Sequence, residues 1–160
     1  SSQVYVVLGA NARHISESME IKANVVHNPD WKAGMGSSIA FGMREIMKSN
    51  EMPHAVLLML ADQPLIDTPY LSELKTQFLR GTGKIVATKY KNGFGVPAIF
   101  HTSLFEELSR LDQQFGARKI IAKYKKDCIS IPSKDKAIDI DTINDYNYII
   151  EKQRIINESI

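Results

Sequence analysis

Short apolar runs alternate with stretches of helical spacing along most of this chain. Runs rich in β-branched residues predict strands at 3–8, 24–27, 55–60, 84–90, 96–100, 128–131 and 138–140. Apolar residues at helical spacing predict helices up to about residue 20, over 37–47, from about 68, at about 102–111 and 116–125, and from 142 onward. This alternation predicts an α/β fold: a single domain whose mostly parallel sheet is covered by helices on both faces.

Local signals predict where three of these helices begin. Ser37 or Ser38 is the expected N-cap of the second helix. Thr68 is the expected N-cap of the third, with Pro69 at its first helical position. Thr142, with Asp145 three residues later, resembles a capping box in which Asp replaces Glu.

Composition and charge exclude several classes of function. The 160 residues fit one domain, and 44% apolar and 24% charged residues are typical of a globular protein. A net charge of +2 is too small to indicate a nucleic-acid partner. No apolar run approaches the length of a membrane span, so no membrane partner is expected. The single cysteine, Cys128, cannot form an internal disulfide, which favours a reducing, cytoplasmic location. Because Cys128 lies in a predicted strand, catalysis by its thiol is not expected.

The apolar run at 55–60 stops at a carboxylate, Asp62, which is followed by Pro64. In open parallel sheets, ligands bind just beyond the carboxyl ends of the strands. An Asp held there can carry a divalent cation that in turn carries phosphates. Asp-x-Pro is also typical of a solvated turn, so the sequence leaves both interpretations open.

A second pair of carboxylates lies near the C-terminal end, in Ile138-Asp-Ile-Asp141-Thr. If this segment is a strand, Asp139 and Asp141 share one face, because strand residues alternate. They can then supply a metal ligand beside Asp62. The alternative is that both carboxylates only favour the N-terminus of the following helix through its dipole.

A glycine- and serine-containing loop precedes the second helix. Gly34 and Gly36 let the backbone approach a ligand closely, and Ser37 and Ser38 offer hydroxyls at a helix N-terminus. Such a loop suits a nucleotide base or a phosphate, although glycine loops before helices are also common caps. It is neither a P-loop nor the dinucleotide fingerprint, because neither residue pattern is complete.

Five short motifs occur in one order along nearly the whole chain. They are Gly34-Met-Gly-Ser-Ser38, Ala61-Asp-Gln-Pro64, Gly95-Val-Pro97, Gly116-Ala-Arg118 and Asp139-Ile-Asp-Thr142. This series resembles the MobA-like nucleotidyltransferase family and looks closest to its molybdenum cofactor cytidylyltransferase branch. The resemblance implies one Rossmann-like domain over residues 1–160, of the nucleotide-diphospho-sugar transferase type.

The resemblance also implies roles for individual residues. Asp62 would be the principal ligand of a catalytic Mg²⁺, with Asp141 as the second carboxylate and Asp139 as the less favoured alternative. The nucleotide would contact Gly34, Gly36, Ser37 and Ser38, and the acceptor would contact Gly95, Val96 and Pro97. The branch often has His at the position of Val96, so we expect one substrate contact of the branch to be absent.

The implied reaction transfers a nucleoside monophosphate from an NTP, CTP in this branch, to a phosphate-bearing acceptor. The acceptor implied is molybdopterin or the molybdenum cofactor, and a molybdoenzyme or its maturation factor is the implied protein partner. A sugar-phosphate nucleotidyltransferase with another acceptor and a non-catalytic nucleotide- or cofactor-binding module are the alternatives.

The front of the sequence departs from the family. Members begin with a strand and a glycine-rich loop, followed by an arginine and a lysine that hold the triphosphate. This sequence instead begins at what looks like the family's second strand. The runs 3–8 and 56–60 are apolar on both faces and carry no edge-blunting charge or proline. We therefore expect another strand to lie between them in the native protein.

Overall fold

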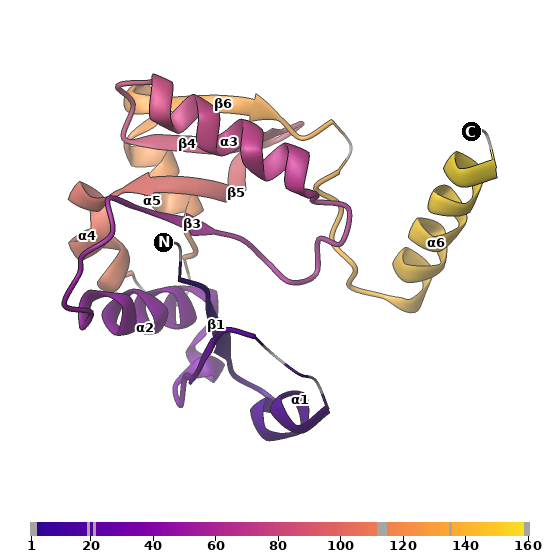
Figure 1. Cartoon of the computed structure of the whole chain (residues 1–160), viewed down its shortest axis with the longest axis horizontal. Coiled ribbons are helices and arrows are strands. Elements are labelled where there is room, and N and C mark those ends of the chain that lie inside the picture. Colours follow the sequence, from indigo (N-terminus) through magenta and orange to yellow (C-terminus); the bar gives the residue numbers. More distant parts are fainter. Residues whose placement is uncertain (1–2, 19, 21, 112–114, 135, 159–160) are drawn as a thin grey trace.

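The computed structural model describes residues 3–18, 20, 22–111, 115–134 and 136–158 (Figure 1). Its elements are β1 (Tyr5–Leu8), α1 (Ala12–Ser18), β2 (Asn24–His27), α2 (Met35–Met47), β3 (Ala55–Leu58), α3 (Thr68–Arg80), β4 (Ile85–Tyr90), β5 (Gly93–His101), α4 (Phe105–Ser109), α5 (Arg118–Lys123), β6 (Cys128–Pro132) and α6 (Ile143–Glu158). Short 3-10 helices occupy Trp31–Ala33, Thr102–Leu104 and Lys125–Asp127. The predicted α/β alternation is confirmed.

The larger sheet has four strands in the order β3-β5-β4-β6. β4 and β6 are parallel, whereas β5 runs antiparallel to both β3 and β4. The α/β class is therefore confirmed, but this sheet is mixed rather than mostly parallel. The reason is local: residues 91 and 92 alone connect β4 to β5, and so short a connection can only join antiparallel strands.

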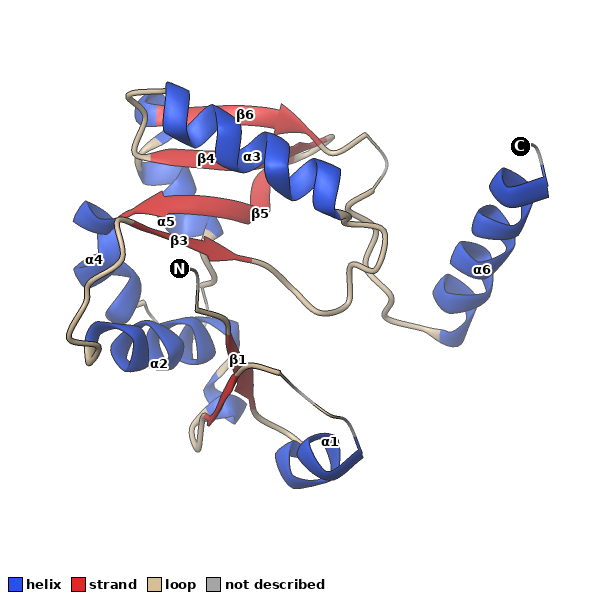
Figure 2. Ribbon diagram, in the orientation of Figure 1, coloured by secondary structure: helices blue, strands red, loops and turns tan. Residues whose placement is uncertain are grey.

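Helices cover both faces of this sheet, as predicted (Figure 2). On one face, α3 packs Tyr70 and Leu74 against Val86 of β4. On the other face, α2, α4 and α5 pack against Ile85 and Ala87. Alternate residues of β4 thus serve two cores, which is the pattern of a strand buried on both faces.

β1 and β2 form a separate two-stranded parallel sheet. Helix α2 packs on both sheets. A Cβ added at Gly42 would lie 2.7 Å from Val7 Cγ2 of β1, while the neighbouring Met43 belongs to the core that contains Val56 of β3. Within the described residues, β1 pairs only with β2 and β3 only with β5. The two strands therefore do not pair directly, and the strand expected between them stays a prediction.

The predicted N-caps of two helices are wrong. Helix α2 begins at Met35 with Gly34 as N-cap, and the Ser37 hydroxyl instead donates to the Gly34 carbonyl at 2.9 Å. Helix α3 is capped by Asp67 rather than Thr68, because the extended Asp67 places its carboxylate to accept from the Tyr70 amide at 3.1 Å.

The C-terminal segment confirms one prediction and contradicts another. The capping box is present: the Thr142 amide donates to Asp145 Oδ2 at 2.8 Å, and the Asp145 amide donates to Thr142 Oγ1 at 3.2 Å. The predicted strand at 138–140 is absent from the described elements. The backbone amide of Ile140 donates to the carbonyl of Asp62, which lies in the loop after β3. Because that loop is not a strand, segment 138–140 has no strand beside it with which to form a ladder of backbone hydrogen bonds.

The last helix, α6, extends away from the larger sheet (Figure 1). In the described ranges, no helix has both the length and the apolar character needed to cross a membrane.

Candidate active site

Asp62 lies in the loop that follows β3 and is half-buried. Its Oδ1 atom is buried and has no hydrogen-bond partner among the described residues. Burial raises the pKa of the Asp62 carboxyl, and the negative charges of Asp139 and, more weakly, Asp141 raise it further. A hydrogen bond from its own backbone amide opposes the shift. Asp62 therefore presents an unsatisfied oxygen in a locally acidic setting.

The segment that carries the other two carboxylates lies beside this loop. The Ile140 amide donates to the Asp62 carbonyl at 2.9 Å, and the Gln63 side-chain amide donates to Asp139 Oδ1 at 2.7 Å. These two bonds join segments that are far apart in the sequence. The predicted convergence of these segments on one place is thus supported by direct contacts.

The buried side chain of Gln63 connects this loop to the larger sheet. Its Nε2 atom donates both to Asp139 and to the Tyr90 hydroxyl, the latter at 3.1 Å. The Tyr90 hydroxyl in turn donates to the Val96 carbonyl. Gln63 is only 5% exposed, so these bonds fix the loop against the end of the β4–β5 hairpin.

Asp139 and Asp141 differ in how strongly they interact with Asp62 and its loop. Asp139 has the larger effect on the Asp62 pKa and is held by Gln63. Both residues are exposed, and the Asp141 backbone amide donates to Asp145 Oδ2 at 3.3 Å. Asp139 is therefore the better fixed neighbour of Asp62, although the resemblance favours Asp141. The roles of all three as metal ligands stay predictions.

The donor set fits a cation shared with substrate. Among the residues that the structure describes, no three His, Cys, Asp or Glu side chains form a metal site by themselves. Mg²⁺ typically takes one or two carboxylates and leaves its other positions to water and phosphate oxygens. The unpaired Oδ1 of Asp62 beside a second carboxylate matches that requirement.

The Gly34–Ser38 segment, predicted to be a loop before the second helix, is instead the N-cap and first turn of α2. Gly34 has a φ of 114°, a conformation that strongly favours glycine, and Gly36 is buried. The buried Asn28 donates to Ser37 Oγ and to Ser38 Oγ, each at 3.0 Å. Within the described part of the chain, none of the hydrogen bonds joins this segment to Asp62. Its contact with a nucleotide therefore stays a prediction, and Asn28 is a supporting residue that sequence reasoning missed.

The predicted acceptor segment, Gly95–Pro97, forms an irregularity in β5. The pairing of β4 with β5 shifts register between Ala87 and Thr88, and the peptide bond between Val96 and Pro97 is cis. Hydroxyl groups bind the carbonyls that this irregularity frees. Thr88 Oγ1 donates to the Pro97 carbonyl at 2.7 Å, and Tyr90 binds that of Val96.

Gly95 provides room for two larger side chains. A Cβ atom at this position would lie 3.1 Å from the Tyr90 ring and 3.5 Å from Arg118 Nε. The Arg118 guanidinium lies 6.0 Å from the centre of the Tyr90 ring. A side chain at position 95 would therefore disturb the packing of Arg118 on Tyr90.

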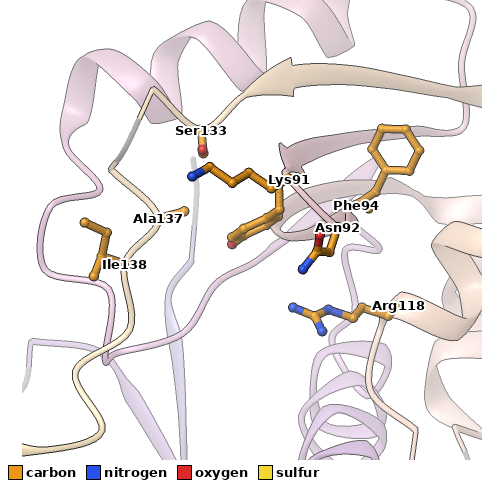
Figure 3. Close-up of a pocket in the computed structure, with 9 residues that line it drawn as sticks. Lys91, Asn92, Phe94, Arg118, Ser133, Ala137 and Ile138 are labelled. Atoms are coloured by element: carbon orange, nitrogen blue, oxygen red, sulfur yellow. The ribbon is translucent and has the colours of Figure 1, made fainter. Parts of the chain in front are cut away.

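A cavity of about 390 Å³ opens beside Tyr90 (Figure 3). Its lining comes from the hairpin, from α5 and from the segment after β6, and consists of Tyr90, Lys91, Asn92, Gly93, Phe94, Arg118, Ser133, Ala137 and Ile138. Of these, Arg118 lies in one of the five motifs, so the sequence could have identified it as a candidate site residue. Lys91 lies in none of the motifs, and nothing in the sequence identified it.

Comparisons with known proteins agree with this architecture. A model of the MobA-like NTP transferase domain matches residues 1–128. No curated protein sequence matches the chain. One similar structure is Rv0371c of Mycobacterium tuberculosis H37Rv in complex with manganese, with 23% identity, a TM-score of 0.76, and coverage of 93% of this chain and 77% of that one.

Two further structures share the fold. A nucleotidyl transferase from Methanothermobacter has 17% identity and a TM-score of 0.73, covering 92% of this chain and 71% of the other. The molybdopterin-guanine dinucleotide biosynthesis protein A of Archaeoglobus fulgidus has 16% identity and a TM-score of 0.63, covering 92% and 78%. Because the family model spans most of the sequence, this chain belongs to the MobA-like NTP transferase domain family, a family of nucleotidyltransferases.

Proposed function

We propose that this protein transfers a nucleoside monophosphate from CTP to a phosphate-bearing acceptor, with Mg²⁺ as the metal and molybdopterin or the molybdenum cofactor as the acceptor. One observation carries the proposal. In a chain of this family, the buried Oδ1 of Asp62 has no partner among the described residues and lies beside the segment of Asp139 and Asp141.

In the proposed reaction, an oxygen of the acceptor phosphate attacks the α-phosphorus of CTP. The bond from the α-phosphorus to the oxygen that bridges to the β-phosphate breaks, and its electron pair leaves with pyrophosphate. The acceptor phosphate is already ionised near neutral pH, so no side-chain base is needed. The chain contributes positioning, and the carboxylates of Asp62 and Asp141 or Asp139 would hold Mg²⁺, which supplies charge neutralisation when bound.

The choice of substrates rests on likeness. The five motifs look closest to the molybdenum cofactor cytidylyltransferase branch, and a molybdopterin-guanine dinucleotide biosynthesis protein shares the fold. The manganese in the similar structure of Rv0371c supports a divalent metal of the same class as Mg²⁺. A molybdoenzyme or its maturation factor would then receive the product.

We also propose that in the working enzyme a further strand pairs between β1 and β3. Each of these strands pairs with a single neighbour in the described residues, yet α2 packs against both of their sheets. Unpaired backbone groups at two apolar strands are costly when buried, and an added strand would satisfy them. The loop after such a strand would reach toward the phosphates near Asp62.

The test is a substrate screen. The protein is incubated with CTP, GTP or ATP, with MgCl₂, and with molybdopterin, the molybdenum cofactor or a sugar phosphate, and pyrophosphate release is measured. The proposal predicts release that needs CTP, Mg²⁺ and a molybdopterin-type acceptor together. Release with a sugar phosphate as the only effective acceptor would favour a sugar-phosphate nucleotidyltransferase. CTP binding without release under any combination would favour a binding module.

A further inference from the structure

The cavity beside Tyr90 has a distinct electrostatic character. Two of the residues that line it, Lys91 and Arg118, are cationic, and no Asp or Glu is among the lining residues. Asn92 and Ser133 add hydrogen-bonding groups to the lining. Figure 3 shows Arg118 and Asn92 directed toward one another, and Lys91 extending toward the segment of Ser133 and Ala137. An anion is the ligand that this lining favours.

Part of the lining is apolar. Phe94 extends from the hairpin, and Ala137 and Ile138 close the opposite side. Tyr90 contributes its ring, over which the Arg118 guanidinium lies 6.0 Å from the centre. A volume of about 390 Å³ is within the usual range for a small-molecule site. The cavity therefore suits a small anion attached to an apolar or planar body.

Hydrogen bonds link the lining of the cavity to the Asp62 loop. Tyr90 lines it and also accepts a hydrogen bond from Gln63, whose side chain binds Asp139. Ile138, another lining residue, directly precedes Asp139. The cationic cavity is thus connected to Asp139 of the candidate metal site through one hydrogen-bonded pair, Tyr90 and Gln63.

We infer that this cavity binds the phosphate group of the acceptor, a small-molecule phosphomonoester, and that Lys91 and Arg118 determine its recognition. The inference rests on the proposed function. A dianionic acceptor must approach three carboxylates, at Asp62, Asp139 and Asp141, and two cations beside its path offset that repulsion. The predicted acceptor segment supports the assignment, because Gly95 leaves the room in which Arg118 lies against Tyr90.

A phosphate in this cavity has two possible sources, the acceptor and the triphosphate of CTP. The lining separates them, because it includes the hairpin beside the acceptor segment and none of Gly34, Gly36, Ser37 and Ser38, the residues predicted to bind the nucleotide. The assignment therefore predicts that an acceptor phosphate and CTP bind together rather than in competition.

Binding of inorganic phosphate tests the inference without turnover. The dissociation constant is measured by NMR from the side-chain N–H signal of Asn92, in wild type and in Lys91→Gln and Arg118→Gln. Each substitution should weaken phosphate binding by about 3- to 10-fold, the range expected for one partly exposed charge-assisted contact. Arg118→Lys, which keeps the charge, should recover part of the loss.

Matched controls come from neighbouring cations. Lys89→Gln and Lys119→Gln remove the same charge from exposed positions that do not line the cavity, and both should leave phosphate binding unchanged. Equal weakening in the controls, or no change in Lys91→Gln and Arg118→Gln, would overturn the inference. So would competitive displacement of phosphate by metal-free CTP, which would assign the cavity to the triphosphate. A failed pyrophosphate screen with these binding results intact would refute the reaction alone.

Discussion

Replacing Thr88 by valine should destabilise the protein strongly for a change of one hydroxyl group. Thr88 is fully buried, and its Oγ1 accepts a hydrogen bond from the Tyr70 hydroxyl at 2.9 Å while donating to the Pro97 carbonyl at 2.7 Å. Valine has nearly the same shape, so it leaves the packing intact and removes both bonds. The Pro97 carbonyl then loses this partner inside the core.

The expected cost follows from the groups left unpaired. A buried polar group without a partner costs about 1–3 kcal/mol. The Tyr70 hydroxyl can turn to the Ile131 carbonyl, already at 3.4 Å, so its share is smaller. We expect Thr88→Val to lower the free energy of unfolding by about 2–4 kcal/mol. Tyr70→Phe keeps the bond to Pro97 and should cost about 1 kcal/mol.

Urea unfolding, followed by circular dichroism, measures these free energies. The double variant should lose about 1 kcal/mol less than the sum of the single variants, because they share one hydrogen bond. Thr76→Val, on the exposed surface of α3, is the control and should stay within about 0.5 kcal/mol of wild type. A Thr88→Val protein as stable as that control, or strict additivity, would show that these hydroxyls do not hold the Val96–Pro97 irregularity.

Three further outcomes are expected. The Lys136 ammonium and the Tyr70 amide lower the pKa of the Asp67 carboxyl, so Asp67→Asn should reduce the Tm at pH 7. That deficit should vanish as the pH falls below the lowered pKa, and a deficit that persists at low pH would contradict it. The pKa of Asp62 is raised, so its ionised form destabilises the folded protein at pH 7. In EDTA, Asp62→Asn should therefore have a higher Tm than wild type at pH 7, and the difference in Tm should close below pH 3.8. A lower Tm would make Asp62 structural. In hydrogen exchange on this chain, β3 amides bonded to β5 should be protected and those on its free edge should exchange quickly; uniform protection would refute the open edge.

Local patterns predicted most of the fold. Strands such as β4 and β6 were found because their apolar, β-branched runs are short and bounded by turn residues. The capping box at Thr142 and Asp145 was found because it depends on residues three apart. Segment 138–140 was misassigned, because its alternating pattern looks like a strand while its neighbour in space, the Asp62 loop, offers a single backbone bond.

The residues that cap the helices were less predictable. Several cap-forming residues stand together at each start, and the sequence does not show which one adopts an extended backbone. At α3, Asp67 precedes Thr68 and takes the cap. At α2, the positive φ of Gly34 sets the boundary before either serine.

The candidate site was predictable only where it follows from strand ends. Asp62 was found because an apolar run stops there. Gln63, Tyr90 and Lys91 were missed because their importance depends on long-range contacts. The Gln63 amide reaches Asp139 at 2.7 Å, and Lys91 acquires meaning only beside Arg118 of α5. Contacts of this kind follow from the packing of elements, which the sequence pattern alone does not specify.

The proposed nucleotidyl transfer depends above all on Asp62. The most direct measurement compares pyrophosphate release by wild type, Asp62→Asn and Asp127→Asn with saturating Mg²⁺, CTP and molybdopterin, using Asp127 as an exposed carboxylate on the 3-10 helix before β6. Asp62→Asn should lower the rate by at least about 100-fold while remaining folded, and Asp127→Asn should keep the wild-type rate. Wild-type turnover by a folded Asp62→Asn protein would contradict the proposal.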